Sequence, residues 1–231
     1  NLFSVKDKVV LVTGGSRGIG EMLASGYCEN GAKVYISARS KDVVTETAKR
    51  ISDRYDSECI GIECDISSIE GVNKLCNEMK KNEDHLDILV NNAGAAWAAP
   101  IENFPEIGWD KVMDICVKSM FFLTQGLLPM LEKTASREDP SRVINIGSID
   151  GINNPEFKNF SYSAAKSAVH HMTRVLAAEL VKKHINVNAI APGPFPSKML
   201  GSAVEFNYSE LEKRNPRGRI GTAEDIAGLA I

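Results

Sequence analysis

Disulfide frameworks and metal sites require patterns of cysteine and histidine that this sequence lacks. Its five cysteines are odd in number and form no Cys-x-x-Cys pair, which favours free thiols in a reducing compartment. Its four histidines are scattered along the chain. The adjacent His170 and His171 would point to different faces of a helix, so we expect no metal site.

Long apolar runs and an excess of basic residues are missing as well. No apolar run approaches the ~20 residues that a membrane-spanning helix needs, and residues 1–8 lack the apolar core of a signal peptide. A net charge of −3 gives nucleic acid or an anionic membrane no electrostatic attraction. We therefore expect a small-molecule partner, no nucleic acid, no membrane and a cytoplasmic location. An organelle stays open, because the chain starts at Asn1 rather than Met, and a terminal signal would lie outside it.

What the sequence does contain is an alternation of short apolar runs with longer helical patterns. The runs predict strands at residues 8–13, 33–37, 59–63, 86–91, 142–147 and 185–190. The helical patterns cover about residues 19–30, 42–55, 69–82, 109–134 and 162–183. Repeated strand–helix units predict an α/β fold of the Rossmann type, a doubly wound parallel sheet with helices on both faces. No linker or repeat interrupts them, so we expect a single catalytic domain over residues 1–231, with a polar surface loop at 134–141.

A glycine-rich turn follows the first predicted strand. Residues 13–20 read Thr-Gly-Gly-Ser-Arg-Gly-Ile-Gly and lead into an amphipathic helix. Without side chains the backbone can approach a pyrophosphate, which the N-terminus of the helix stabilises. A tight turn without a ligand is the alternative. The residues expected to hold a dinucleotide here are Gly14, Ser16, Arg17, Gly18, Ile19 and Gly20.

The end of the second strand indicates which dinucleotide binds. An acidic residue there accepts a hydrogen bond from the ribose 2′-hydroxyl, whereas a basic residue suits a 2′-phosphate. This chain has Ser37, Ala38 and Arg39 and no carboxylate. Arg39 and Arg17 offer donors whose geometry matches phosphate, so we predict NADPH rather than NADH. The alternative is that both arginines are solvated surface charges.

Three residues are candidates for catalysis. Tyr162 and Lys166 lie four residues apart in a predicted helix, so their side chains share one face. A neighbouring ammonium favours the phenolate, and an oxidised nicotinamide would add to the effect. Tyr162 would then exchange protons near neutral pH. Ser148 follows the fifth strand, at the edge where parallel sheets bind ligands, and could bind a carbonyl oxygen. Taken singly, a solvated Tyr–Lys pair and a capping serine are the plainer interpretations.

Taken together, these motifs resemble the short-chain dehydrogenase/reductase family over essentially the whole chain. The resemblance rests on the turn at residues 13–20, Asp65, the Asn-Asn-Ala-Gly run at 91–94, Ser148 with Gly151, Tyr162 with Lys166, and Pro192-Gly193. It implies that Ser148 and Tyr162 bind the substrate oxygen and that Tyr162 transfers the proton. Lys166 would lower the pKa of Tyr162 and hold the nicotinamide ribose.

The same resemblance implies a set of further cofactor contacts. Those residues are Asp65 and Ile66 beside the adenine, Asn91, Ala93 and Gly94 in the cleft, and Pro192 and Gly193 leading to Ser197 at the carboxamide.

Cys116 departs from the family's pattern, which usually has Asn at this position. That Asn helps to hold a water that links the lysine to solvent, largely through its main-chain carbonyl. The resemblance therefore leaves open whether catalysis is intact or weakened. Residues 218–221 and 224–226 resemble the helix before the family's last strand, which we expect beyond Ile231.

The substrate is indicated by further resemblance to a bacterial NADPH-dependent 3-oxoacyl reductase of the family. The stretches concerned are residues 12–20, 89–94 with Trp97, 142–148 and 184–197. An apolar loop around Met199, Leu200, Val204 and Phe206 would accept an acyl chain, or would only pack as a lid. We therefore predict the reduction of a ketone, such as a 3-oxoacyl thioester.

Two other functions stay open at this point. One is an alcohol, sugar or polyol dehydrogenase of the same family, and the other is a dinucleotide-binding sensor that has lost turnover. The family pairs its subunits through the helices at residues 109–134 and 162–183, so the resemblance implies a homodimer or homotetramer.

Overall fold

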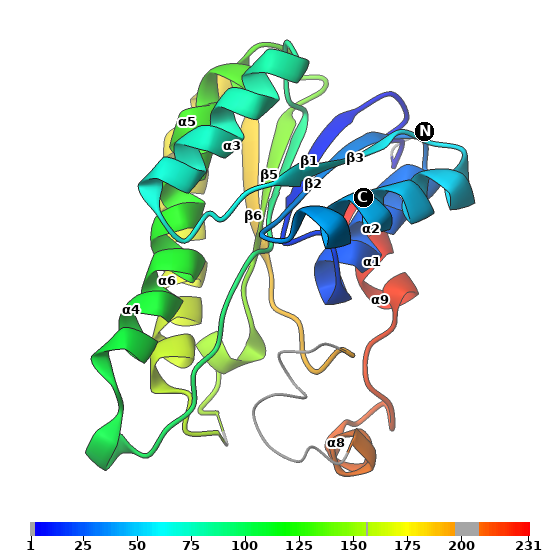
Figure 1. Cartoon of the computed structure of the whole chain (residues 1–231). Coiled ribbons are helices and arrows are strands. Elements are labelled where there is room, and N and C mark those ends of the chain that lie inside the picture. The colour runs from blue at the N-terminus through cyan, green and yellow to red at the C-terminus, as the bar shows by residue number, and fades with distance from the viewer. Residues whose placement is uncertain (1–2, 156, 197–207) are drawn as a thin grey trace.

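Six parallel strands form one sheet in the computed structural model of this chain, which describes residues 3–155, 157–196 and 208–231 (Figure 1). The strand order is β3-β2-β1-β4-β5-β6. The order reverses beside β1, as in a doubly wound Rossmann sheet, so the predicted fold is confirmed. The strands span Val9–Thr13 (β1), Lys33–Ala38 (β2), Cys59–Glu63 (β3), Ile88–Asn91 (β4), Ser141–Ile146 (β5) and Ile185–Ile190 (β6).

Helices cover both faces of the sheet, and two apolar clusters fill the space between them. Because side chains alternate along a strand, Val10 and Val12 of β1 enter one cluster, whereas Val9 and Leu11 enter the other. The first face carries α1, α2 and α9, and the second carries α3, α5 and α6 (Figure 1). Burial on both faces explains why β1 is an unbroken apolar run.

Most helices lie close to the predicted ranges. They span Gly18–Glu29 (α1), Lys41–Tyr55 (α2), Ile69–Asn82 (α3), Glu106–Met113 (α4), Ser119–Glu132 (α5), Phe160–Leu180 (α6), Tyr208–Arg214 (α8) and Ala223–Ala230 (α9). Short 3₁₀ turns lie at Ile101–Asn103 (η1), Ile149–Gly151 (η3) and Val181–Lys183 (η4).

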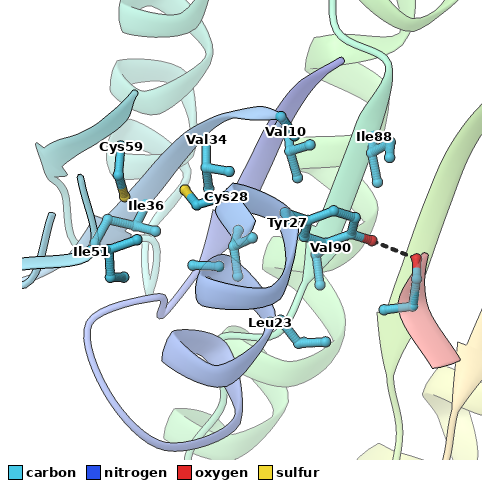
Figure 2. Packing of buried hydrophobic residues seen from close by; sticks show 14 of the residues in the cluster. Val10, Leu23, Tyr27, Cys28, Val34, Ile36, Ile51, Cys59, Ile88 and Val90 are labelled. Carbon is cyan, nitrogen blue, oxygen red and sulfur yellow. Dashed lines mark hydrogen bonds between the residues drawn. The ribbon is translucent and has the colours of Figure 1, made fainter. Parts of the chain in front are cut away.

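Tyr27 joins the two ends of the described chain on the first face. Its ring is fully buried in the cluster that Figure 2 shows. Its hydroxyl donates to the main-chain oxygen of Ala230 in α9 at 2.7 Å, so the only polar atom of the side chain is satisfied. This bond holds α9 against α1, the helix that begins at the glycine-rich turn.

The helical run from Glu106 to Glu132 corrects two expectations. The single helix predicted over residues 109–134 is divided by a π-helical turn, η2, at Asp114–Lys118. The run is also 27 residues long and, by length and composition alone, apolar enough to cross a membrane, contrary to the expectation that no such run exists. Its part α5 packs Leu123, Leu127 and Leu131 into the second cluster, so these apolar residues serve the core of this fold.

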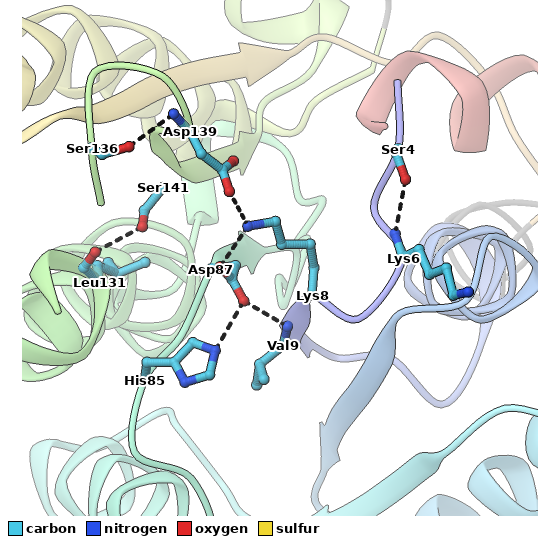
Figure 3. Close-up of polar contacts among 10 residues, drawn as sticks. All are labelled: Ser4, Lys6, Lys8, Val9, His85, Asp87, Leu131, Ser136, Asp139 and Ser141. Atoms are coloured by element: carbon cyan, nitrogen blue, oxygen red, sulfur yellow. Dashed lines mark hydrogen bonds and ion pairs between the residues drawn. The ribbon is translucent and has the colours of Figure 1, made fainter. Parts of the chain in front are cut away.

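An ion-pair network joins strands β1, β4 and β5 at their amino ends (Figure 3). Lys8 binds Asp87 at 3.0 Å and Asp139 in the polar loop before β5. Asp87 also accepts a hydrogen bond from the main chain of Val9 at 2.8 Å and lies 3.3 Å from His85. Burial disfavours the ammonium, yet the bonds to Asp139 and Asp87 outweigh it and raise the pKa of Lys8. This network attaches the predicted surface loop to the sheet, at the edge opposite the motif residues.

Candidate active site

The carboxyl ends of the parallel strands gather the predicted site residues along one edge of the sheet. The glycine-rich turn follows β1, Ala93 and Gly94 follow β4, and Ser148 follows β5. The order of the strands reverses between β1 and β4, which is where doubly wound sheets bind ligands. Residues distant in sequence therefore meet at the position that the topology favours for a site.

The turn after β1 is shaped by glycines that leave no room for a side chain. Gly14 and Gly18 have φ angles of +63° and +54°, which glycine adopts readily. A Cβ on Gly20 would lie 2.3 Å from the carbonyl oxygen of Gly14 and 2.5 Å from Nδ2 of Asn92. The cap residue of α1, Arg17, makes no side-chain bond to the first turn. The main-chain N–H groups there remain available to an anion.

The residues predicted to meet the rest of the dinucleotide lie in two environments. Arg17 and Arg39 are exposed, as is Asp65, which caps the turn after β3 by accepting from the main chain of Ser67 at 3.0 Å. Ile66 is buried, with 6% of its surface exposed. Ser16 is also largely buried, and its carbonyl accepts a hydrogen bond from Thr47 of α2 at 3.3 Å.

The two asparagines after β4 have different roles. Asn91 points into the core, where its amide donates to Asn145 at 2.9 Å and to Thr124 at 3.2 Å. Asn92, by contrast, donates to the main-chain oxygens of Thr13 at 2.8 Å and Gly14 at 3.2 Å. Asn92 therefore holds the glycine-rich turn directly, whereas Asn91 supports the sheet below it.

Ser148, Tyr162 and Lys166 come together although they lie on a turn and a helix. The Ser148 side chain lies near enough to the Tyr162 phenol to lower its pKa. Lys166 lies one helical turn after Tyr162, with its ammonium 5.5 Å from the centre of the phenol ring. The ammonium also donates to the carbonyl oxygen of Ile146, the last residue of β5, at 2.6 Å. Lys166 is only 4% exposed, so its charge lies inside the protein.

Burial is the main influence on the electrostatics of this trio. It raises the pKa of Tyr162 above its ordinary value, and the Ser148 side chain only partly opposes that rise. Burial also lowers the pKa of Lys166, because desolvation disfavours the charged form of each group. The lowering of the Tyr162 pKa by Lys166 together with an oxidised nicotinamide stays a prediction.

Cys116 lies beside the lysine because the π turn places it there. Its thiol donates to the carbonyl oxygen of Ala95 at 3.5 Å. A Cβ on Gly94 would lie 3.4 Å from the Cys116 sulfur and 3.8 Å from the Lys166 ammonium. A cavity of about 10 Å³ is lined by Cys116 and Lys166 among others, which is about the space of one water molecule. Cys116 is 3% exposed and packs in a small apolar cluster with Val112 and Ala165.

The segment after β6 closes the site on its far side. The carbonyl of Pro192 accepts from the main chain of Ile149, the residue after Ser148, at 3.2 Å. Among the described residues, a Cβ on Gly193 would find Ile149 alone within 4 Å, at 3.9 Å. Ser197 and the apolar residues of the predicted substrate loop lie outside the described residues.

The comparisons with known proteins agree with this geometry. The sequence profile described as short chain dehydrogenase matches residues 8–207. The chain belongs to the short-chain dehydrogenase family. It is thus an oxidoreductase with the fold, the strand order and the motif spacing of that family.

Particular members of the family resemble the chain over nearly its full length. The rhamnolipids biosynthesis 3-oxoacyl-[acyl-carrier-protein] reductase of Pseudomonas aeruginosa is 46% identical, covering 99% of this chain and 90% of that protein. The NAD-dependent glycerol dehydrogenase of Listeria innocua is 33% identical, covering 99% and 87%. Among solved structures, the RhlG/NADP active-site complex of Pseudomonas aeruginosa has a TM-score of 0.94 at 45% identity, covering 99% and 89%. The predicted resemblance to a bacterial 3-oxoacyl reductase is confirmed.

The residues that support the site through hydrogen bonds without lining it were not identified from the sequence. Asn145 interrupts the apolar run of β5, and that interruption is a signal that a buried polar partner is needed. Its amide donates to Thr173 of α6 at 3.0 Å and its carbonyl accepts from Asn91 of β4. His170 contacts the main chain of Ser148, and nothing in the local sequence indicates this contact.

Proposed function

We propose that this chain is an NADPH-dependent reductase of 3-oxoacyl thioesters or closely related ketones. The observation that carries the proposal is geometric: the buried ammonium of Lys166 lies 5.5 Å from the centre of the Tyr162 ring, and Ser148 follows β5 beside the phenol. A ketone reductase needs a proton donor and a second hydrogen-bond donor at the same carbonyl oxygen. Ser148 and Tyr162 have the right chemistry for those two roles.

Each of the three residues would have a distinct role in the reaction. The hydroxyls of Ser148 and Tyr162 bind the substrate carbonyl oxygen and draw electron density away from its carbon. NADPH, when bound, supplies the hydride that this carbon accepts. The oxygen then takes the proton of Tyr162 and becomes the hydroxyl group of the alcohol product. Lys166 places a positive charge beside the phenol, so it stabilises the phenolate that remains.

The residues that would hold NADPH are those predicted from the sequence. The turn at Gly14–Gly20 fits a pyrophosphate, because its crowded glycine positions keep the backbone free of side chains and its helix has no side-chain cap. The exposed guanidiniums of Arg17 and Arg39 suit a 2′-phosphate. The further contacts proposed are Asp65, Ile66, Asn91, Ala93, Gly94, Tyr162, Lys166, Pro192, Gly193 and Ser197, with Asn92 added as the residue that fixes the turn.

The relatives support both the substrate and the cofactor. The 46% identical relative is named for a 3-oxoacyl-[acyl-carrier-protein] substrate, and the solved structure described above is a complex with NADP. The glycerol dehydrogenase supports a second candidate, oxidation of a polyol with NAD. Arg39 at the end of β2, where an NAD enzyme has a carboxylate, favours the reductase.

We also propose that the protein is cytoplasmic and acts as a homodimer or homotetramer. The helices α4 and α6 expose apolar side chains, with Ile107 at 71% and Val175 at 51% exposure. Such side chains are typical of surfaces that pair subunits. Sedimentation velocity at micromolar concentration tests the assembly, and a monomer under those conditions would contradict it.

The decisive experiment follows NADPH consumption by absorbance, with acetoacetyl thioesters as substrates. Two assays run in parallel: the same thioesters with NADH, and glycerol with NAD. Replacing Tyr162→Phe removes the proton donor and leaves the ring in place. We expect kcat to fall by about 10²- to 10⁴-fold, with NADPH affinity unchanged by fluorescence titration.

Each result has a defined meaning. Turnover that prefers NADPH and disappears in Tyr162→Phe supports the proposal. Turnover of glycerol with NAD, and none of the thioester, would replace it with the polyol dehydrogenase. Binding of NADPH without turnover of any carbonyl or alcohol would favour the sensor and would point to Cys116 as its cause.

A further inference from the structure

Three side chains of α6 attach the turn that carries Ser148 to the helix that carries Tyr162. Ser163 donates to the carbonyl oxygen of Asp150 at 2.7 Å, and Ser167 donates to that of Gly151 at 2.7 Å. The ring of His170 lies 3.0 Å from the carbonyl oxygen of Ser148. Residues spaced by four and three along a helix share one face. One face of α6 therefore holds the whole turn.

The ring of His170 occupies the space where a side chain at position 147 would lie. A Cβ on Gly147 would lie 2.2 Å from Cε1 and 2.7 Å from Nε2 of the His170 ring. The ring is therefore packed directly against the backbone at the end of β5. Any side chain at position 147 would displace the ring, so the glycine and the histidine form a complementary pair.

A single ring nitrogen faces both main-chain groups of Ser148. Nε2 of His170 lies 3.0 Å from the Ser148 oxygen and 3.4 Å from the Ser148 nitrogen. One nitrogen of a neutral ring either donates or accepts. The shorter distance favours the tautomer in which Nε2 carries hydrogen and donates to the carbonyl.

The position of this bond matters because the ladder between β5 and β6 ends just before it. The ladder ends with the bond from the nitrogen of Gly147 to the oxygen of Ile190, at 2.7 Å, and past Ser148 the nitrogen of Ile149 donates to the oxygen of Pro192 at 3.2 Å. The hydroxyl of Ser148 accepts from the nitrogen of Asp150 at 3.1 Å. The direction of that hydroxyl toward Tyr162 depends on where the Ser148 backbone lies, and His170 is the side chain that bonds to the Ser148 main chain between those two bonds.

His170 does not belong to the group of residues that would contact the substrate. It lines a groove of about 530 Å³ between α6 and β6, together with Thr173, Arg174, Val187 and Asn188 among others. Neither Tyr162 nor Lys166 lines that groove. The ring therefore contacts the main chain of Ser148 from a groove that Tyr162 and Lys166 do not line.

We propose that His170 is a positioning residue, which sets the hydroxyl of Ser148 for carbonyl reduction by a hydrogen bond to the Ser148 main chain. The inference rests on the proposed function of Ser148. If the hydrogen bond from His170 is what matters, another side chain with a donor at the same place can substitute for histidine, whereas an apolar side chain of similar size cannot.

The test is a double-mutant cycle with two substitutions of His170. His170→Gln retains a donor where Nε2 lies, and His170→Met retains bulk without one. A small displacement of a reacting group costs up to about 100-fold in rate, so we expect His170→Met to lower kcat by about 10- to 100-fold with the KM for NADPH unchanged. His170→Gln should stay within about threefold of wild type. In a Ser148→Ala background, where no hydroxyl remains to be positioned, His170→Met should change kcat by less than about twofold.

The neighbouring His171 provides the matched control. It is exposed on the same turn of α6 and contacts Arg174 rather than Ser148. His171→Met should therefore leave kcat unchanged. Three results would overturn the inference: wild-type kcat in His170→Met, an equal loss in His170→Gln, or an undiminished effect of His170→Met in the Ser148→Ala background. Full turnover in Ser148→Ala alone would instead refute the proposed role of Ser148, and the role of His170 with it.

Discussion

The turns after β1 and after β5 lie on the same edge of the sheet, yet they are held in place by opposite means. The first turn depends on absent side chains, because a Cβ on Gly20 would overlap the oxygen of Gly14 at 2.3 Å. The second turn depends on side chains that are present, since Ser163, Ser167 and His170 bond to its main chain.

The difference follows from what each turn would contact. A turn that binds pyrophosphate works through its own main-chain N–H groups, so any side chain would obstruct it. A turn that presents a serine hydroxyl must fix one rotatable group relative to Tyr162, which requires external hydrogen bonds. The first turn should therefore be sensitive to added atoms and the second to removed ones.

The largest effect expected from this comparison is that of an added methyl group in the first turn. Gly20→Ala places a Cβ against Gly14 and Asn92, and overpacking of this kind costs about 1–3 kcal/mol. If the turn moves to relieve the overlap, NADPH affinity falls by about 10- to 100-fold. Fluorescence titration of NADPH measures the loss.

Gly228→Ala is the matched control, because position 228 lies in α9 with nothing within 4 Å of an added Cβ. It should leave NADPH affinity unchanged. Equal affinity in Gly20→Ala and wild type would show that the first turn tolerates added atoms, and would break the comparison.

A smaller effect is expected when atoms are removed from the second turn. The double substitution Ser163→Ala and Ser167→Ala deletes two hydrogen bonds of 2.7 Å, each worth about 0.5–1.5 kcal/mol of unfolding free energy. We expect kcat to fall by about 3- to 10-fold as the turn loosens, while NADPH affinity is unchanged. Steady-state kinetics and urea unfolding separate the two effects.

Ser57→Ala serves as the control for stability alone. Ser57 also donates to a main-chain oxygen, that of Ala32 at 2.9 Å, but in a turn away from the site. Its loss should lower unfolding free energy without changing kcat. A fall in kcat of the same size as in the double variant would mean that general stability, rather than the turn, sets the rate.

The sequence predicted all six strands because each is a short run rich in apolar residues, which the inner strands β1 and β4 bury completely and the edge strands β3 and β6 only in part. It missed the π turn at Asp114–Lys118, because no residue type marks such a turn and the apolar residues continue as one helical run across it. It also assigned Asn91 to the cofactor cleft without Asn92, since two adjacent asparagines give no local sign of which one faces the core and which one the turn.

The sequence by itself determined the order of strands and helices, the glycine-rich turn, and the spacing that puts Tyr162 and Lys166 on one face of a helix. These features depend on neighbours within a few residues of each other. The tertiary structure decided that Ser148 lies beside Tyr162, that His170 holds the Ser148 main chain, and that burial raises the pKa of the phenol. Such features depend on burial and on contacts between distant segments, and both arise only when β5 and α6 pack together.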